Sequence, residues 1–126
     1  MKTNHLRIYT DTESLICLLY RALNQMTARN RVVFGDKMLD KALRMFAHID
    51  RANRHKRDAA KYIDDLEEDF VCLLALVRLC DKLGLMQRRH VEDIAVQVAV
   101  IDEQIGRWRR YVLSRQRTSP QGDVED

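Results

Sequence analysis

The segment from 91 to 112 carries an unbroken heptad pattern of apolar residues. Steps of three and four residues alternate along it, through Val91, Ile94, Val98, Ile101, Ile105, Trp108 and Val112. This spacing places all seven side chains on one face of an α-helix, where they can interlock with those of neighbouring helices. A chain with such a segment is expected to form a helical bundle or a coiled coil, with helices crossing at about 20°.

Three earlier segments show the same helical spacing. Their apolar stripes are Leu15, Leu19, Ala22 and Met26; Leu39, Ala42, Phe46 and Ile49; and Ile63, Leu66, Phe70, Leu73, Val77 and Cys80. We therefore predict an all-α fold, an antiparallel up-down-up-down four-helix bundle over residues 1–116. A single long coiled coil is disfavoured by Gly84 and by the stretch 53–58, which lacks apolar residues. The four helices of the predicted bundle are expected at about 11–29, 33–53, 58–83 and 87–115, followed by a disordered tail over 117–126.

Local signals suggest where some of these helices begin and end. Thr10 and Glu13 have the spacing of a capping box, which predicts the start of the first helix. Gly35 interrupts the second segment, so its helix is expected to begin at either Val32 or Asp36. Gly84 is predicted to end the third helix in a left-handed conformation.

Composition narrows the class of protein further. The chain has only 4 Gly and 1 Pro, too few turn formers for a many-stranded β fold. Its three cysteines, Cys17, Cys72 and Cys80, lie in apolar helical segments without zinc-ligand spacing, which indicates packed, reduced thiols in a cytoplasmic protein. We recognise no signal peptide and no run of about 18 apolar residues that would span a membrane.

No catalytic or metal-binding motif stands out. The chain lacks the Glu-x-x-His pairs of di-iron bundles, the HExxH and GxSxG motifs and a glycine-rich phosphate loop. The acidic run from Asp64 to Asp69 covers several helix faces and is interpreted as a solvated surface near a helix start. Because apolar heptads fill the expected core, we predict a protein that is not an enzyme and has no catalytic residue, metal site or cofactor.

The outward positions of the helices differ in character. On the second helix they are expected to be polar, namely Asp40, Lys41, Arg44, His48 and Arg51. On the third and fourth helices they are apolar instead, namely Val71, Cys72, Ala75, Leu79, Val96, Ala99 and Val100. An exposed apolar patch usually marks an interface, so these seven residues are predicted to form the contact surface of a homo-oligomer. The alternative is a core wider than the chosen seam.

Basic residues are expected to gather where the second and fourth helices end. The candidate nucleic-acid-binding residues are Arg51, Arg54, Lys56, Arg57, Arg107 and Arg110. Clustered cations at one end of a bundle suit the phosphates of RNA or DNA. The alternative is ordinary helix chemistry, since cations near helix C-termini complement the helix dipole.

From Phe34 to Trp108 the chain resembles a family of bacterial four-helix-bundle proteins. The residues that carry the resemblance are the runs 36–39 (DKML), 62–66 (YIDDL), 79–85 (LCDKLGL) and 105–108 (IGRW). The family comprises the ribosomal intervening-sequence proteins and the Avd-type accessory proteins of diversity-generating retroelements.

The resemblance implies a fold, an assembly and a role. Members of this family form pentameric rings of the same bundle. Avd-type members bind nucleic acid and a reverse transcriptase through a basic surface and are not enzymes. Avd-type proteins look more strongly basic, whereas this chain has 19 acidic residues. We therefore expect an oligomeric accessory protein that binds nucleic acid or a nucleic-acid enzyme; the alternative is a structural homo-oligomer or protein scaffold that binds no nucleic acid.

Overall fold

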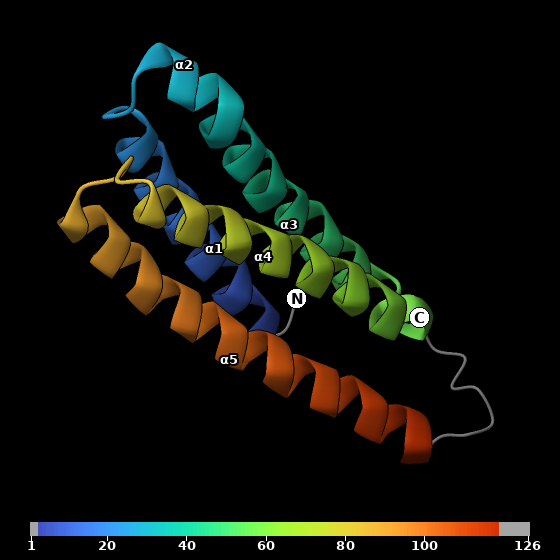
Figure 1. Cartoon of the computed structure of the whole chain (residues 1–126). Coiled ribbons are helices and arrows are strands. Elements are labelled where there is room, and N and C mark those ends of the chain that lie inside the picture. Colours follow the sequence, from blue (N-terminus) through green and yellow to red (C-terminus); the bar gives the residue numbers. More distant parts are fainter. Residues whose placement is uncertain (1–2, 119–126) are drawn as a thin grey trace.

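The chain is all-helical, as the sequence predicts. A computed structural model describes residues 3–118, and the side chains of residues 7–116, with no strand in this part of the chain. Its four long helices are α1 (Thr3–Leu23), α3 (Asp36–Arg54), α4 (Ala59–Lys82) and α5 (Arg88–Thr118) (Figure 1). Three short elements complete it: α2 (Ala28–Asn30), the π-helical η1 (Arg31–Gly35) and the 3₁₀ turn η2 (Lys56–Asp58).

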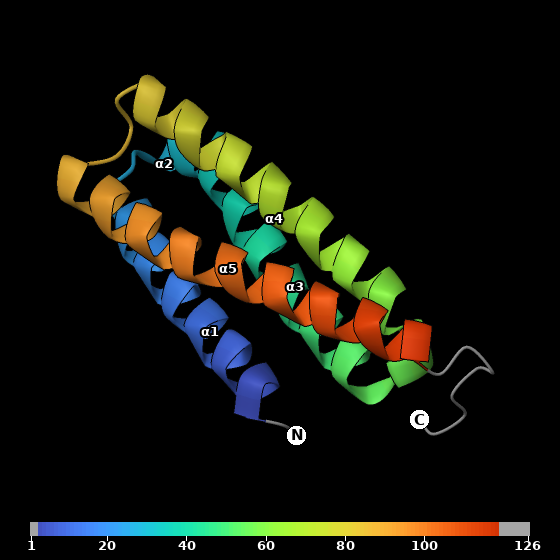
Figure 2. The ribbon, with the colours of Figure 1, turned by 90° about the horizontal axis from the view of Figure 1, so that it is seen from below.

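The four long helices lie side by side (Figures 1 and 2). The buried apolar residues of all four form one core cluster. α3 packs most extensively on α4, whereas α1 packs on both α3 and α5, and the contact between α4 and α5 is the least extensive of the four. α3 and α5 are not a packed pair, so α1 and α4 lie between them. None of the helices in the described part of the chain is long and apolar enough to cross a membrane.

The predicted seams of the first, third and fourth helices lie in the core. All six stripe residues of α4, from Ile63 to Cys80, are buried. On α5 the five positions Ile94, Ile101, Ile105, Trp108 and Val112 are buried. The remaining two, Val91 and Val98, are half-buried against the core. The heptad period therefore identifies the inward face of both helices.

The seam of α3 is rotated from the predicted one. Met38, Ala42, Met45, Ile49 and Ala52 are the buried apolar residues of this helix. Leu39 and Phe46, predicted as core, are only half-buried. Phe46 instead stacks on Tyr9 of α1, with ring centroids 4.6 Å apart. The prediction was wrong because α3 has apolar residues on two adjacent stripes, and the sequence does not show which one faces inward.

The first helix begins earlier than predicted. α1 starts at Thr3, and Thr10 lies within it, its hydroxyl donating to the carbonyl of Arg7 at 3.1 Å instead of capping. The physical reason is Ile8, which is 1% exposed and belongs to the same core stripe as Leu15. The polar residue Thr12, although buried, falls between them and hides the periodicity of the stripe.

Gly35 does not break the second helical segment. Helical structure begins at Ala28, where the amide of Asn30 donates to the Thr27 hydroxyl at 3.2 Å, and continues through η1 into α3. A Cβ atom on Gly35 would lie 2.9 Å from Cγ of Leu23, so glycine allows the close approach of α1 here. The first helix consequently ends at Leu23 rather than near 29.

The predicted glycine cap of the third helix is confirmed. Gly84 has a φ of 72°, and the amide of Leu85 donates to the carbonyl of Cys80 at 2.9 Å. This is the left-handed arrangement that satisfies the last carbonyls of a helix. The fourth helix extends to Thr118, beyond the predicted end at 115. Residues 119–126 of the predicted tail lie outside the described part of the chain.

Candidate functional site

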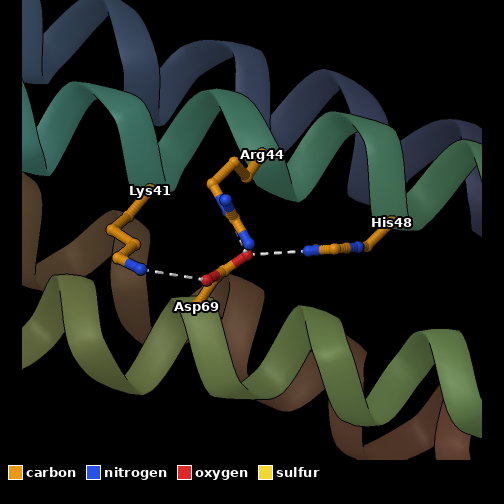
Figure 3. Close-up of polar contacts among 4 residues, drawn as sticks. All are labelled: Lys41, Arg44, His48 and Asp69. Carbon is orange, nitrogen blue, oxygen red and sulfur yellow. Dashed lines mark hydrogen bonds and ion pairs between the residues drawn. The ribbon is translucent and has the colours of Figure 1, made fainter.

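A buried carboxylate between α3 and α4 forms the most distinctive polar cluster of the described side chains (Figure 3). Asp69 of α4 is 5% exposed. It accepts a hydrogen bond from Nε of Arg44 at 3.1 Å and lies 2.7 Å from Nε2 of His48. Nζ of Lys41 completes the cluster at 3.5 Å. Three nitrogen-bearing side chains of one helix therefore converge on a single acid of the next.

Helix geometry explains why these residues meet. Lys41, Arg44 and His48 follow steps of three and four residues, which places them on one face of α3. Asp69 precedes the core residue Phe70 by one position, so it lies beside the core seam, on the flank of α4 that faces α3. The close packing of α3 on α4 brings the two flanks together.

The cluster stabilises the ionised form of the acid. Burial raises the pKa of Asp69, but the hydrogen bonds from His48 and Arg44, together with the nearby positive charge, outweigh it and hold the pKa below the ordinary value. In return, the hydrogen bond from Asp69 raises the pKa of the Arg44 guanidinium. Both groups are therefore charged at neutral pH.

The environment of His48 favours one protonation arrangement. Its Nδ1 atom is buried and has no hydrogen-bond partner among the described residues. A proton on Nδ1 would be a buried donor without an acceptor, which is costly. Of the two neutral tautomers, the one protonated on Nε2 donates to Asp69 and avoids this cost.

Two predictions about these residues were wrong. His48 was expected to point outward but is 7% exposed. Asp69 was expected on a solvated surface together with the rest of the run 64–69. Both predictions failed for the same reason, because His48 of α3 and Asp69 of α4 are hydrogen-bond partners. A polar side chain can be buried when such a partner satisfies its hydrogen bonds. The basic spacing at 41, 44 and 48 is the one sequence signal that hinted at a shared face.

Another part of the acidic run also binds across helices. Arg109 of α5 donates to Asp64 and, at 2.6 Å, to Glu67. At the other end of the same helix pair, Arg88 donates to Asp81 at 3.1 Å. The helices with the least extensive contact are thus joined by ion pairs near both ends.

The described part of the chain contains no group of three or more His, Cys, Asp or Glu residues placed to hold a metal ion. The Asp69 cluster itself pairs one carboxylate with two cations and an imidazole. Such an arrangement fixes charges in space and can present cationic donors to an anion. It includes no serine, threonine or cysteine as a nucleophile beside the imidazole.

All six candidate nucleic-acid-binding residues are exposed. Two of them form ion pairs within their own helix, Arg54 with Asp50 at 2.7 Å and Arg107 with Glu103 at 3.0 Å. The six residues come from two stretches of the chain. One group surrounds the connection between α3 and α4, namely Arg51, Arg54, Lys56 and Arg57, and the other, Arg107 and Arg110, lies on α5.

All seven candidate interface residues are exposed as well. Val71 and Val96 are 57% and 67% exposed, high values for valine in a packed helix. The two stripes differ in direction. Val71 lies one turn after Glu67, which faces α5, whereas Val100 lies one turn before Gln104, which donates to Asp11 of α1 at 2.6 Å. The α4 stripe therefore lies toward α5, whereas the α5 stripe lies toward α1, so the two do not meet along the seam between α4 and α5.

A further group of exposed apolar residues was not predicted. Its members belong to α1, η1 and α3 and are Tyr20, Val32, Val33 and Leu43. Sequence reasoning missed them because it expected polar residues on the outward face of the second helix and identified outward apolar positions only on the third and fourth helices. The molecule therefore exposes apolar side chains on two different sets of helices.

No protein-family model matches this chain, and no curated protein is significantly similar to it. Its proposed function therefore depends on its own side chains and surfaces and on the sequence resemblance described above.

Proposed function

We propose that this chain is a non-enzymatic, cytoplasmic, oligomeric helical-bundle protein that acts as an accessory to nucleic acid or to a nucleic-acid enzyme such as a reverse transcriptase. The observation that carries the proposal is the exposure of all seven apolar candidate interface residues on α4 and α5. Exposed cations near the connection of α3 and α4 supply the surface for nucleic acid. The resemblance to intervening-sequence and Avd-type proteins suggests the same role.

The proposal includes the antiparallel up-down-up-down topology. Short connections join the long helices, and consecutive helices pack on each other, which is typical of that topology. α1 also packs on α5, so each long helix contacts two of the other three. In this arrangement the outer faces of all four helices are available to partners.

Self-association follows from the cost of the exposed apolar surface. Burying apolar area contributes about 25 cal/mol per Å², so a face of valines, leucines and alanines favours contact with another protein surface. A second copy of the chain offers a different apolar group, on α1, η1 and α3. Two unlike faces favour head-to-tail contacts, which form a ring when the rotation between neighbouring copies closes. The pentameric ring suggested by the resemblance is one such assembly.

Glutamate at the two most exposed valines of this face, Val71→Glu with Val96→Glu, is expected to convert the oligomer into a monomer, because burying the new carboxylates is unfavourable. Light scattering coupled to size exclusion at tens of micromolar gives the mass. Lys61→Glu, at an exposed position of α4 outside the face, is the control and should stay oligomeric. A monomeric wild-type protein, or an unchanged mass of the double variant, would contradict the proposed interface.

Nucleic-acid binding is supported by cations that have no competing partner. Arg51, Lys56 and Arg110 are exposed and form no ion pair within residues 7–116. Oligomerisation would repeat these charges around the assembly. Because each phosphate contact releases counterions from the nucleic acid, binding should weaken as the salt concentration rises.

The double substitution Arg51→Ala with Lys56→Ala is expected to weaken binding to single-stranded RNA. Each lost phosphate contact lowers the slope of log K against log salt by about 0.7, so the pair should lower it by about 1.4. Fluorescence anisotropy with a fluorescein-labelled oligouridylate between 50 and 200 mM salt measures it. The matched control is Arg29→Ala with Arg78→Ala, two exposed arginines elsewhere. Absence of salt-dependent binding by the wild type would refute this function.

The second candidate function is a protein scaffold that binds no nucleic acid. The ion pairs of Arg54, Arg107 and Arg109 with neighbouring acids favour it, because they reduce the positive potential of the surface. This function predicts an oligomer of unchanged mass after nuclease treatment, with no RNA binding even at 50 mM salt.

A further inference from the structure

We propose that the flank of α3 that faces α4 is the binding path for single-stranded nucleic acid, with Arg44 as an anchored phosphate contact and the ring pair His55–Tyr62 as a base-stacking platform. This inference rests on the proposed nucleic-acid function. It moves the site from the helix ends, where the sequence predicted it, to the side of one helix.

A row of basic side chains runs along this flank. Its positions follow steps of four and three residues without interruption: Lys37, Lys41, Arg44, His48, Arg51 and His55. At a rise of about 1.5 Å per residue the row is about 27 Å long. His48 is buried, but the other five side chains are exposed or half-exposed. At its end the row continues into the exposed residues Lys56 and Arg57 of η2.

Arg44 is prepared for a second anion. It binds Asp69 through Nε alone, so its four Nη protons have no partner among the described side chains. The side chain is 55% exposed, which makes that edge of the guanidinium accessible. Planar guanidinium groups bind phosphate through such a pair of donors. Because Asp69 already holds the side chain in place, phosphate binding costs less conformational entropy than at a free arginine.

The aromatic rings lie at the end of the row. The His55 and Tyr62 rings are 6.0 Å apart between centroids and tilted by 48°. His55 is exposed and Tyr62 half-buried, so one ring is supported by the fold and the other faces solvent. Nζ of Lys61 lies 5.9 Å from the Tyr62 centroid and adds a cation nearby. Cations along a groove with an aromatic platform are the combination by which proteins hold single strands.

Duplex nucleic acid fits this arrangement less well. Bases within a duplex are stacked on each other and do not reach a ring on a protein surface. The cationic row is also partly neutralised, since Asp40 and Asp65 act on Arg44 and Asp69 cancels one charge. Tight binding therefore needs a base stacked on the aromatic rings in addition to the phosphate contacts. Only a single strand can supply such a base, so this site should prefer single strands.

The test uses the full chain, a fluorescein-labelled 20-nucleotide oligouridylate and anisotropy at several salt concentrations. Lys37→Ala and Arg44→Ala should each lower the salt slope by about 0.7, which corresponds to about five-fold weaker binding at 0.1 M salt. Arg78→Ala removes an exposed arginine from α4 outside the row and should leave both values unchanged. Lys37 forms no ion pair within residues 7–116, so its substitution leaves the Asp69 cluster intact.

The platform is tested with His55→Ala, which should weaken binding about five-fold or more if a base stacks there. An unlabelled duplex of equal length should compete less well than the unlabelled single strand. Normal binding by the Lys37 and His55 variants, or equal competition by duplex, would overturn the inference. If Arg110→Ala, on α5 outside the row, still weakens binding in that case, the proposed function stands without this path. Complete lack of binding by the wild type would refute both.

Discussion

Replacing Phe70 by alanine is expected to lower the free energy of unfolding by about 4 kcal/mol. Phe70 is 1% exposed, at the centre of the α4 seam. Its removal forfeits the transfer of a benzyl group from water and leaves a cavity that packed helices fill only in part. Urea unfolding followed by circular dichroism at 222 nm measures the change, with the m value as a check on two-state behaviour.

The neighbouring residue supplies the control. Val71 is 57% exposed, so Val71→Ala should change the free energy by no more than about 0.5 kcal/mol at concentrations where the chain is monomeric. If the chain associates as proposed, the same variant should lose stability at concentrations where the oligomer forms, because association would contribute to it. Equal losses for both variants in the monomer would mean that the inward face of α4 is assigned wrongly.

Replacing Asp69 by alanine is expected to cost about 3 kcal/mol. The substitution leaves the buried Nε2 donor of His48 without an acceptor and removes the charge that holds Arg44 and Lys41. Breaking a buried pair costs about 3–5 kcal/mol when the remaining charge stays buried. The lower end applies here, since Arg44 is 55% exposed and returns to water. Urea unfolding at pH 7 gives the value.

A double-mutant cycle with His48 isolates the energy of the contact between His48 and Asp69 from the other effects of each substitution. Asp69→Ala and His48→Ala together should cost less than the sum of the two single changes by about 1–3 kcal/mol, because both remove the same interaction. Glu68→Ala, at the exposed preceding position, is the matched control and should be nearly neutral. Additive effects would show that His48 and Asp69 are not energetically coupled.

The effect of Asp69 should also depend on pH. Because the folded chain holds the pKa of Asp69 below the ordinary value of about 3.9, this group contributes stability that is fully present above pH 5. The contribution is lost as the pH falls through the ordinary value toward the lower, folded one. The difference in unfolding free energy between wild type and Asp69→Ala should therefore shrink below about pH 4. A difference that is constant from pH 7 to pH 3 would contradict the lowered pKa.

Sequence periodicity alone determined most of the secondary structure. The heptads of α4 and α5 identify helices and also their inward faces, since their core stripes are single and uninterrupted. Gly84 ended a helix as expected, because a left-handed φ of 72° strongly favours glycine over other residues. The outward apolar residues of α4 and α5 were likewise identified from the same heptad, by exclusion from the core. These features depend on local geometry, which a sequence records directly.

Only the tertiary structure decided two features of this protein. The first is which face of a helix with two apolar stripes is turned inward, and the second is which residues pair with its buried polar groups. On α3 the core stripe includes Met45 rather than Phe46, a choice set by the surfaces of α1 and α4. Ile8 extends α1 because a core exists for it to join. His48 and Asp69 are 21 positions apart in sequence, and each would be exposed without the other. Burial of a polar group depends on a specific partner across the interface, and a one-dimensional pattern gives residue spacing but not that pairing.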